Sequence, residues 1–461
     1  MKLALSNHAL YMPAISSAYA RYGYGQRFKN SYDFTEKQLN FLDPNEGMFN
    51  YPYALYSAGQ AAATDGAAQR TTFITKKERY KGLTTIIGDS GGFQIQQGTI
   101  KFEGNKTCER ILRWLEGTAD YSMTLDFPTG GIGKGRMEAH RNRLTRAGHD
   151  IAGMTARNGQ SLDFNAALKQ SILNLDYFVT NRKAGATKFL NVLQGRNEDE
   201  SKAWYEEVKG FDLEGWAFAG LHQCTFSMVL NRLLDMWDDG YLQKAEWIHF
   251  LGISTFPAAY LFTAILRCIR QVNPAISISF DTSNAFTTAV NGLFYAWARQ
   301  DKRVSKAEQY KLSEVAPEDE DVSLNDLCAH LSLSEDVPKQ QLTAWNNVFA
   351  LPANTHIGSK VRMSDLLSPR IQGGSRRMTS DGITFLMNHN ADFLLRCFRR
   401  LNSNIDNSTD HEFMPPSAVM VKACIEQVFQ AAFIDGNMVM ARNIIGQTQA
   451  TLDRLAIERF Q

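Results

Sequence analysis

Residues 89–94 (DSGGFQ) place three chemically useful side chains within one short turn. They follow residues 84–87 (TTII), a β-branched run that predicts a short buried strand. The two glycines allow the backbone to turn sharply and to come close to a ligand. The segment therefore delivers a carboxylate, a π-face and an amide together to the mouth of a pocket.

The same segment could instead carry a nucleophilic serine, because residues 88–92 (GDSGG) match the string around that serine in chymotrypsin-like proteases. That chemistry requires a histidine and a second aspartate upstream, on an antiparallel barrel. His8 is the only histidine before Ser90, and residues 1–30 contain no apolar core of signal-peptide length. We therefore interpret Ser90 as a structural residue.

Strand-like and helix-like segments alternate over most of the chain. Strands are predicted at 7–16, 48–57, 84–88, 121–126, 188–194, 215–220, 247–253 and 276–281, and helices at 108–117, 136–157, 161–176, 226–237 and 257–271. Such alternation indicates parallel strands joined by helical crossovers, and eight units in roughly 300 residues is the size of a (β/α)8 barrel. A doubly wound sheet is the alternative, although no Gly-x-Gly-x-x-Gly loop follows an early strand. The sequence predicts an α/β fold with a (β/α)8 catalytic barrel over 1–300.

The character of the chain changes after residue 300. Residues 312–338 hold eight acidic residues and no Lys or Arg, which we interpret as a solvated loop. Residues 360–400 carry eight basic residues against three acidic ones, and this stretch is the best candidate for phosphate contacts. We expect an acidic linker and a basic segment at 301–400, followed by closing helices at 401–461.

Composition excludes several classes of protein. With 44% hydrophobic and 21% charged residues, the chain is typical of a soluble globular protein, and we expect no apolar stretch long enough to span a membrane. The six cysteines are scattered without paired spacing, which fits reduced thiols in a cytoplasm. A net charge of +1 neither favours nor excludes a nucleic-acid partner.

Polar residues recur at the predicted carboxyl ends of the strands. Asp89, Asp126 and Asp281 lie at three of these ends, and Gln194 and Gly220 lie at two others. In a parallel barrel these ends share the face that carries the chemistry. One strand-end aspartate is more often a helix N-cap, but three with a glutamine, beside glycine-rich loops, are harder to explain as caps.

With these residues identified, residues 89–94 resemble the signature of the tRNA-guanine transglycosylase family. Four further segments follow in that family's order: 125–128 (LDFP), 192–195 (VLQG), 218–221 (FAGL) and 279–281 (SFD). His389-Asn390, followed by 393–396 (FLLR), resembles the family's late zinc-histidine helix. The similarity covers about residues 84 to 400, in patches.

The resemblance implies exchange of a guanine in nucleic acid for a 7-deazaguanine. Asp281 would be the nucleophile that holds a covalent glycosyl intermediate through C1′, and Asp89 the general acid and base. The target nucleotide must be unstacked to reach such a pocket. The base would be held by Phe93 as a stacking face opposite Leu251, by Asp126 at N1–H and the 2-amino group, and by Gln194 and the Gly220 backbone at O6, with Gly195 and Leu221 beside them.

The resemblance implies that 301–400 is zinc-subdomain-like, but its metal site departs from the family pattern. Family members that act on tRNA carry a Cys-x-Cys-x-x-Cys cluster, whereas residues 328–333 here read CAHLSL. Cysteine and histidine are zinc ligands and leucine is not, so Cys328, His330 and His389 would supply three ligands and the fourth is missing. Glu335, Asp336 or Cys397 could complete the site, or it could be lost, with His389 a core histidine. No organic cofactor is expected.

The polymer is indicated by a second departure. Bacterial tRNA enzymes follow the nucleophile with a Pro-Thr-Arg run, whereas residues 282–286 read TSNAF. The chain thus looks most like the DpdA-type DNA-guanine transglycosylases, and we expect DNA rather than tRNA, a base such as preQ0, a cytoplasmic location and no membrane partner. The phosphate contacts are predicted at Arg376, Arg377, Arg396 and Arg399. A tRNA enzyme and a non-catalytic, transglycosylase-like binding subunit stay open as alternatives, as does a homodimer.

Overall fold

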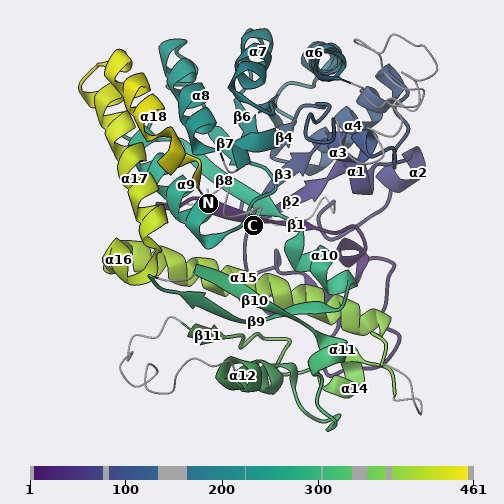
Figure 1. Ribbon diagram of the computed structural model, residues 1–461. Helices are drawn as coiled ribbons and strands as arrows, with labels where there is room; N and C mark the ends of the chain where they lie inside the picture. The colour runs from purple at the N-terminus through teal and green to yellow at the C-terminus, as the bar shows by residue number, and fades with distance from the viewer. Residues whose placement is uncertain are drawn as a thin grey trace, which may run out of the picture.

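A closed barrel of eight parallel strands forms the centre of the molecule (Figure 1). The computed structural model describes residues 5–75, 82–132, 163–223, 225–302, 305–334, 350–369 and 376–454. Each strand pairs with the next in the sequence, and the first pairs with the last to close the barrel. The strands are β1 (Leu10–Ile15), β2 (Tyr53–Ser57), β3 (Thr85–Asp89), β4 (Tyr121–Met123), β5 (Lys188–Leu193), β6 (Gly215–Phe218), β7 (Trp247–Phe250) and β8 (Ser277–Thr282). The predicted (β/α)8 barrel is confirmed.

Helices on the outside of the barrel connect successive strands (Figure 1). They are the short α1 (Ala58–Ala61), α2 (Asp65–Ala68) and α3 (Gly92–Gln96), and the longer α4 (Asn105–Thr118), α6 (Phe164–Asn181), α7 (Glu198–Val208), α8 (Phe226–Asp238) and α9 (Phe256–Ile269). The predicted helix at 136–157 lies outside the described residues. Helix α9 begins at the N-cap Thr255, whose side chain accepts from the Ala258 N–H, and it is buried along almost its whole length.

Side chains on the two faces of each strand pack into two separate hydrophobic cores. On β3, Ile86 packs in the outer core between strands and helices, whereas Ile87 belongs to the cluster inside the barrel. Successive side chains of a strand point to opposite faces, and both faces are covered here, so the strand reads as a continuous apolar run. The interior cluster is filled by Met12, Leu55, Ile87, Met123, Leu190, Val192, Ala217, Ala219 and Trp247.

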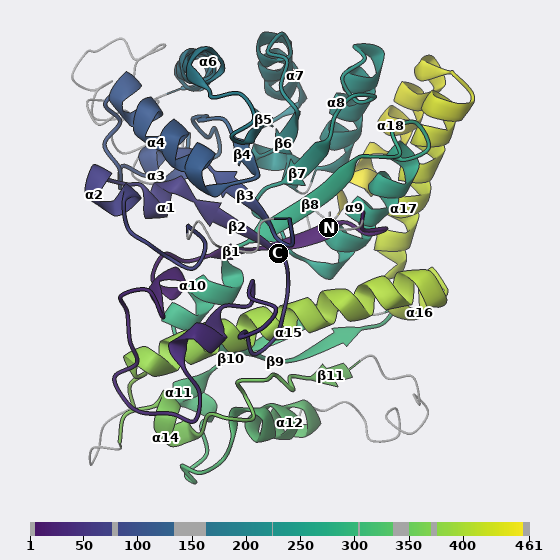
Figure 2. The ribbon, with the colours of Figure 1, turned by 180° about the vertical axis from the view of Figure 1, so that it is seen from behind.

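A second, smaller layer follows the barrel. Helix α10 (Asn284–Val290) leads into an antiparallel sheet of order β10-β9-β11, built from β9 (Leu293–Gln300), β10 (Ser305–Lys311) and β11 (Ala350–Pro352). The long helix α15 (Ser380–Asn407) runs between this sheet and the barrel (Figures 1 and 2). Strand β9 ends at Gln300 and so lies within 1–300, yet it belongs to the small sheet and not to the barrel. Shorter elements near it are η1 (Tyr19–Arg21), η2 (Glu36–Leu39), α11 (Leu312–Val315) and α14 (Met363–Leu366).

The acidic stretch at 312–338 is not simply a solvated loop. It contains α11 and also α12 (Leu324–Ser334), which packs against β9 and β11. Four residues at helical spacing are buried in α12: Leu324, Leu327, Cys328 and Leu331. This spacing was the signal for an amphipathic helix, and the surrounding carboxylates masked it.

The C-terminal helices close the outside of the barrel. They are α16 (Asp410–Phe413), α17 (Pro416–Phe429), the π-helical η4 (Gln430–Ile434) and α18 (Met438–Leu452). Within the described chain, Pro416–Ile434 is long and apolar enough to cross a membrane, contrary to the expectation from the sequence. It packs against α9 and α18. A helix in the core of a soluble protein has the same length and composition, so this is weak evidence for a membrane segment.

Candidate active site

A cavity of about 720 Å³ opens at the carboxyl ends of the barrel strands. All eight strands contribute to its wall, at their last residues or in the loops that follow them. The cavity is lined by every residue predicted to act in catalysis or base binding: Asp89, Phe93, Asp126, Gln194, Gly195, Gly220, Leu221, Leu251 and Asp281. Ser90 does not line it and is fully buried, which fits its interpretation as structural.

Two glycines allow the loop after β3 to pack closely against the loops that follow β2 and β4. Gly91 has a φ of +85°, and a Cβ atom there would lie 2.3 Å from the Cα of Gly59. A Cβ at Gly92 would lie 2.0 Å from the carbonyl oxygen of Asp126. Any other residue would push these loops apart, so the glycines allow the β3–α3 turn to sit between its neighbours.

Asp281 lies on β8 with both of its hydrogen bonds on one carboxylate oxygen. The Gly252 N–H donates to Oδ1 at 2.8 Å, and His249 Nε2 lies 3.2 Å from the same oxygen. No described group donates to Oδ2, and Asp281 lines the cavity. This arrangement holds the carboxylate in one orientation and leaves its second oxygen for chemistry.

His249 was not identified from the sequence. It is completely buried on β7, and its Nδ1 lies 2.8 Å from Ser279 Oγ, which also accepts from Trp247 Nε1 at 2.6 Å. An ionised carboxylate can only accept, so His249 Nε2 donates to Oδ1 of Asp281. In the tautomer with its single proton on Nε2, Nδ1 accepts from the Ser279 hydroxyl.

Strand register assembles this chain of hydrogen bonds. His249 pairs with Ser279 across β7 and β8, and Trp247 and Asp281 are each two residues away on the same face. The only sequence signal was a histidine within an apolar strand, which by itself does not name a partner.

Asp89 is held at the end of β3 by two donors. Ser57 Oγ donates to Oδ2 at 2.5 Å, and the Gly91 N–H donates to Oδ1 at 3.3 Å. Burial raises the pKa of Asp89; the two hydrogen bonds oppose that shift, and the nearby charge of Asp281 adds to it. A carboxyl group with a raised pKa can carry a proton to a leaving group. Ser57, which pairs with Asp89 in the β2–β3 register, was also missed from the sequence.

Asp126 and Gln194 form an acceptor–donor pair in the wall. Gln194 Nε2 donates to Asp126 Oδ2 at 2.7 Å, while Gln194 Oε1 accepts from the Thr129 N–H at 3.4 Å and from Thr129 Oγ1 at 3.3 Å. Thr129 thereby fixes which end of the amide faces Asp126. Desolvation raises the pKa of Asp126 to about 7, against the Gln194 hydrogen bond and with the help of the Asp89 charge.

The rim of the cavity contains an exposed aromatic face. Phe93 is 59% exposed although it lines the cavity, so its ring is accessible to a ligand. Gln223 also lines the cavity, whereas His222 does not and bonds to Ser201 Oγ and the Ala219 carbonyl. Burial lowers the pKa of His222 to about 4, so this histidine is neutral and structural.

The three predicted zinc ligands do not converge. Cys328 is buried in the core, His330 is exposed, and His389 is fully buried in α15. Both nitrogens of His389 are occupied, Nδ1 with Thr355 Oγ1 at 2.8 Å and Nε2 with the Tyr295 carbonyl at 2.8 Å. No group of three His, Cys, Asp or Glu suited to a metal occurs within the described ranges, where Glu335 and Asp336 are not included. The residues present therefore do not fit a zinc ion.

The predicted phosphate-binding arginines are largely engaged elsewhere. Arg376 is buried; it donates to the Ser368 and Met363 carbonyls and pairs with Glu320 at 3.0 Å. Its prediction as a surface contact is thus not supported, because the guanidinium stabilises the loop around α14. Arg396 is bound to Asp392, and Arg399 donates to the Asn50 carbonyl. Arg377 is exposed.

Comparison of the chain with models of known protein families gave no match. No curated protein matches it significantly either.

Proposed function

We propose that this protein is a glycosyltransferase that exchanges guanine in a nucleic acid for a 7-deazaguanine, through a covalent aspartyl intermediate. The observation that carries the proposal is the set of three carboxylates around one cavity, each in a different hydrogen-bonding environment. Pairs of titratable groups whose surroundings separate their pKa values are how one site performs both acid and nucleophile chemistry.

The first step uses Asp281 and Asp89. Oδ2 of Asp281 bonds to C1′ as the C1′–N9 bond breaks, and the departing guanine takes the proton that Asp89 carries. The incoming base then returns a proton to Asp89, its N9 bonds to C1′, and the bond between C1′ and Asp281 breaks. The donors on Oδ1 of Asp281 and the raised pKa of Asp89 suit these two roles.

Guanine selectivity would come from the Asp126–Gln194 pair. A carboxylate accepts from both N1–H and the 2-amino group of guanine, and adenine would leave it unpaired at a half-buried position. The Gln194 amide and the Gly220 backbone lie in the same wall and would serve O6, with the exposed ring of Phe93 available for stacking. A cavity of about 720 Å³ is within the usual range for a small-molecule site.

We favour DNA over tRNA as the polymer. Residues 282–286 lack the Pro-Thr-Arg run, and the residues in place of the cysteine cluster do not form a metal site in the described chain. Both departures are from the pattern of the enzymes that act on tRNA, so the polymer proposal depends on the same resemblance as the chemistry.

The test measures which polymer loses its guanine. Duplex DNA and tRNA, each labelled in guanine, are incubated with the protein and preQ0, and label release is followed with wild type, Asp281→Asn and Asp212→Asn. The control removes a carboxylate that is 79% exposed and precedes β6, at the opposite end of the barrel. We expect release from DNA by the wild type and the control only. Release from tRNA alone would reject the DNA proposal, and binding without release from either polymer would favour a non-catalytic subunit.

A further inference from the structure

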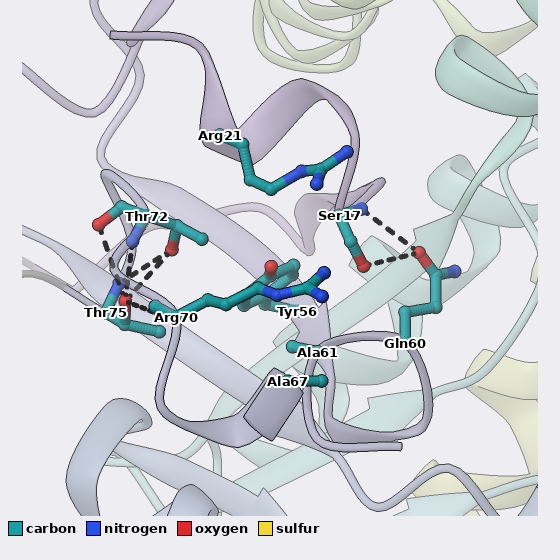
Figure 3. A pocket seen from close by; sticks show the side chains of 9 residues that line it. All are labelled: Ser17, Arg21, Tyr56, Gln60, Ala61, Ala67, Arg70, Thr72 and Thr75. Carbon is teal, nitrogen blue, oxygen red and sulfur yellow. Dashed lines mark hydrogen bonds between the residues drawn. The ribbon is translucent and has the colours of Figure 1, made fainter. Parts of the chain in front are cut away.

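A second cavity, of about 120 Å³, shares a lining residue with the active-site cavity. Figure 3 shows the side chains that line it. Its wall comes from three separate segments: the turn before and through η1, the region from the end of β2 to α2, and the loop at residues 70–75. The side chains used below are Ser17, Arg21, Tyr56, Gln60, Arg70 and Thr72. Gln60 lines this cavity and the active-site cavity, so the two are separated by about one side chain.

Two guanidinium groups line this cavity without a carboxylate. Arg21 and Arg70 extend toward the same side, where Ser17 and Gln60 lie (Figure 3). No Asp or Glu is present in the described lining. Nε of Arg21 is buried and has no hydrogen-bond partner. Because a buried donor without a partner costs about 1–3 kcal/mol, a missing acceptor at this position is indicated.

Hydroxyl groups complete the lining. Tyr56 is 1% exposed and reaches the hydroxyls of Ser17 and Thr72. Burial raises the pKa of Tyr56, so its hydroxyl stays protonated. The loop that carries Thr72 is fixed by its own bonds, since the Thr72 N–H donates to Thr75 Oγ1 at 2.9 Å and the Thr75 N–H to Thr72 Oγ1 at 3.1 Å. The hydroxyl groups of this loop are thus held in a prearranged form.

We propose that this cavity binds a phosphate group. Paired guanidinium groups with hydroxyl donors, and no competing carboxylate, match the charge and geometry of phosphate oxygens. The volume is well below the roughly 300–1,000 Å³ of sites for drug-sized ligands, so the cavity suits a small group such as phosphate. Adjacency through Gln60 makes a backbone phosphate near the extruded nucleotide the expected source, a statement that rests on the proposed function. A free phosphate ion is the other source of the same chemistry.

The first experiment measures salt-dependent binding of a fluorescent oligo(dT), which has backbone phosphates and no guanine. Variants are Arg70→Gln, Arg21→Gln, the double variant, and Lys244→Gln as a control. Lys244 is 56% exposed in an ion pair with Asp212 before β7. One lost phosphate contact lowers the slope of log K against log salt by about 0.7 for single strands. We expect this loss in the double variant, about tenfold weaker binding for Arg70→Gln, and no change in the control.

The second experiment separates the sources of phosphate. Thermal unfolding is followed with inorganic phosphate against chloride at equal ionic strength. Stabilisation of the wild type by phosphate, lost in Arg70→Gln while the oligo(dT) slope is unchanged, assigns the site to free phosphate and rejects the backbone source. Absence of both effects overturns the proposal. Arg70 is exposed, so its variant tests the site even if Arg21→Gln fails to fold.

Base exchange is measured in parallel, because its outcome is independent. Normal exchange by the double variant with unchanged KM and salt slope would reject the backbone phosphate as the source and leave the transglycosylase proposal standing. A reduced salt slope in the double variant, with no base exchange even by the wild type, would support the phosphate site and reject the transglycosylase proposal.

Discussion

His249 Nε2 and Asp281 Oδ1 lie 3.2 Å apart, joining a fully buried histidine to a carboxylate at the wall of the main cavity. The histidine is oriented in turn by Ser279 and Trp247. We therefore assign His249 as a positioning residue, which holds the Asp281 carboxylate in one orientation at the cavity wall while the ring itself stays out of the cavity.

Replacement of His249 should lower the rate more than the affinity. A hydrogen bond to a charged group contributes about 1.5–3 kcal/mol, so we expect His249→Leu to reduce kcat by roughly 10- to 150-fold with little change in KM. His249→Gln, whose amide can donate to Oδ1, should recover part of this loss. Equal rates for the Leu and Gln variants, with both folded, would contradict an orienting hydrogen bond.

Loss of Asp281 should abolish exchange. Asp281→Ala removes the atom that forms the covalent bond, so the rate should fall by several powers of ten, at about tenfold for each ~1.4 kcal/mol of lost stabilisation. No protein–polymer adduct should then survive denaturing electrophoresis. Asp89→Ala should also lose turnover but still bind the base. Near-normal exchange by Asp281→Ala would show that the nucleophile is another residue.

Asp126 should give both base binding and folding stability a pH dependence. Its pKa of about 7 means that the carboxylate, which accepts from guanine, is formed as the pH rises through 7, so guanine should bind more tightly at pH 8 than at pH 6. Asp126→Asn should bind guanine weakly at both values. Isothermal titration with free guanine measures this directly.

The effect of Asp126 on folding stability has the opposite sign, because stability decreases as the pH rises. The folded protein holds a proton on Asp126 between about pH 4 and pH 7, where the unfolded chain has lost it, so the free energy of unfolding falls across this window. The effect is at most about 4 kcal/mol, and screening by cavity water reduces it. Urea unfolding of wild type and Asp126→Asn should diverge with rising pH, with the variant relatively more stable at pH 8. The same pH dependence of the free energy of unfolding in both proteins would show that the pKa of Asp126 is near its ordinary value.

Removal of metal should leave the fold intact. Both ring nitrogens of His389 are already bonded, and burial lowers its pKa to about 4, as expected for a neutral core histidine. We expect EDTA to leave the thermal unfolding curve unchanged. Purified protein with one zinc per chain, lost together with stability on chelation, would contradict this prediction.

Substitution of Arg376 should change folding stability without changing nucleic-acid binding, and substitution of its neighbour Arg377 should leave stability unchanged. Arg376→Ala removes three contacts of a buried guanidinium, so it should lower the free energy of unfolding by about 1–3 kcal/mol and leave the salt slope of binding unchanged. Arg377→Ala, at an exposed neighbour, should leave stability unchanged. A stable Arg376→Ala with a reduced salt slope would restore Arg376 as a phosphate contact.

The sequence by itself determined the barrel and most of the residues at the carboxyl ends of its strands. Strand and helix periodicity is local, and the carboxyl ends of parallel strands must share one face, so Asp89, Asp126 and Asp281 could be assigned together from the positions of three strands. The buried spacing of Leu324, Leu327, Cys328 and Leu331 was equally local, although a dense set of carboxylates concealed it.

Only the tertiary structure decided which groups support these carboxylates. Ser57 meets Asp89, and His249 meets Asp281, through the register between neighbouring strands, which is set by packing over the whole barrel and not by any one segment. Burial of a charge is likewise a property of the surroundings, so the sequence could not separate Arg376, enclosed by its own loop, from Arg21 and Arg70, which meet at a cavity from segments far apart in the chain.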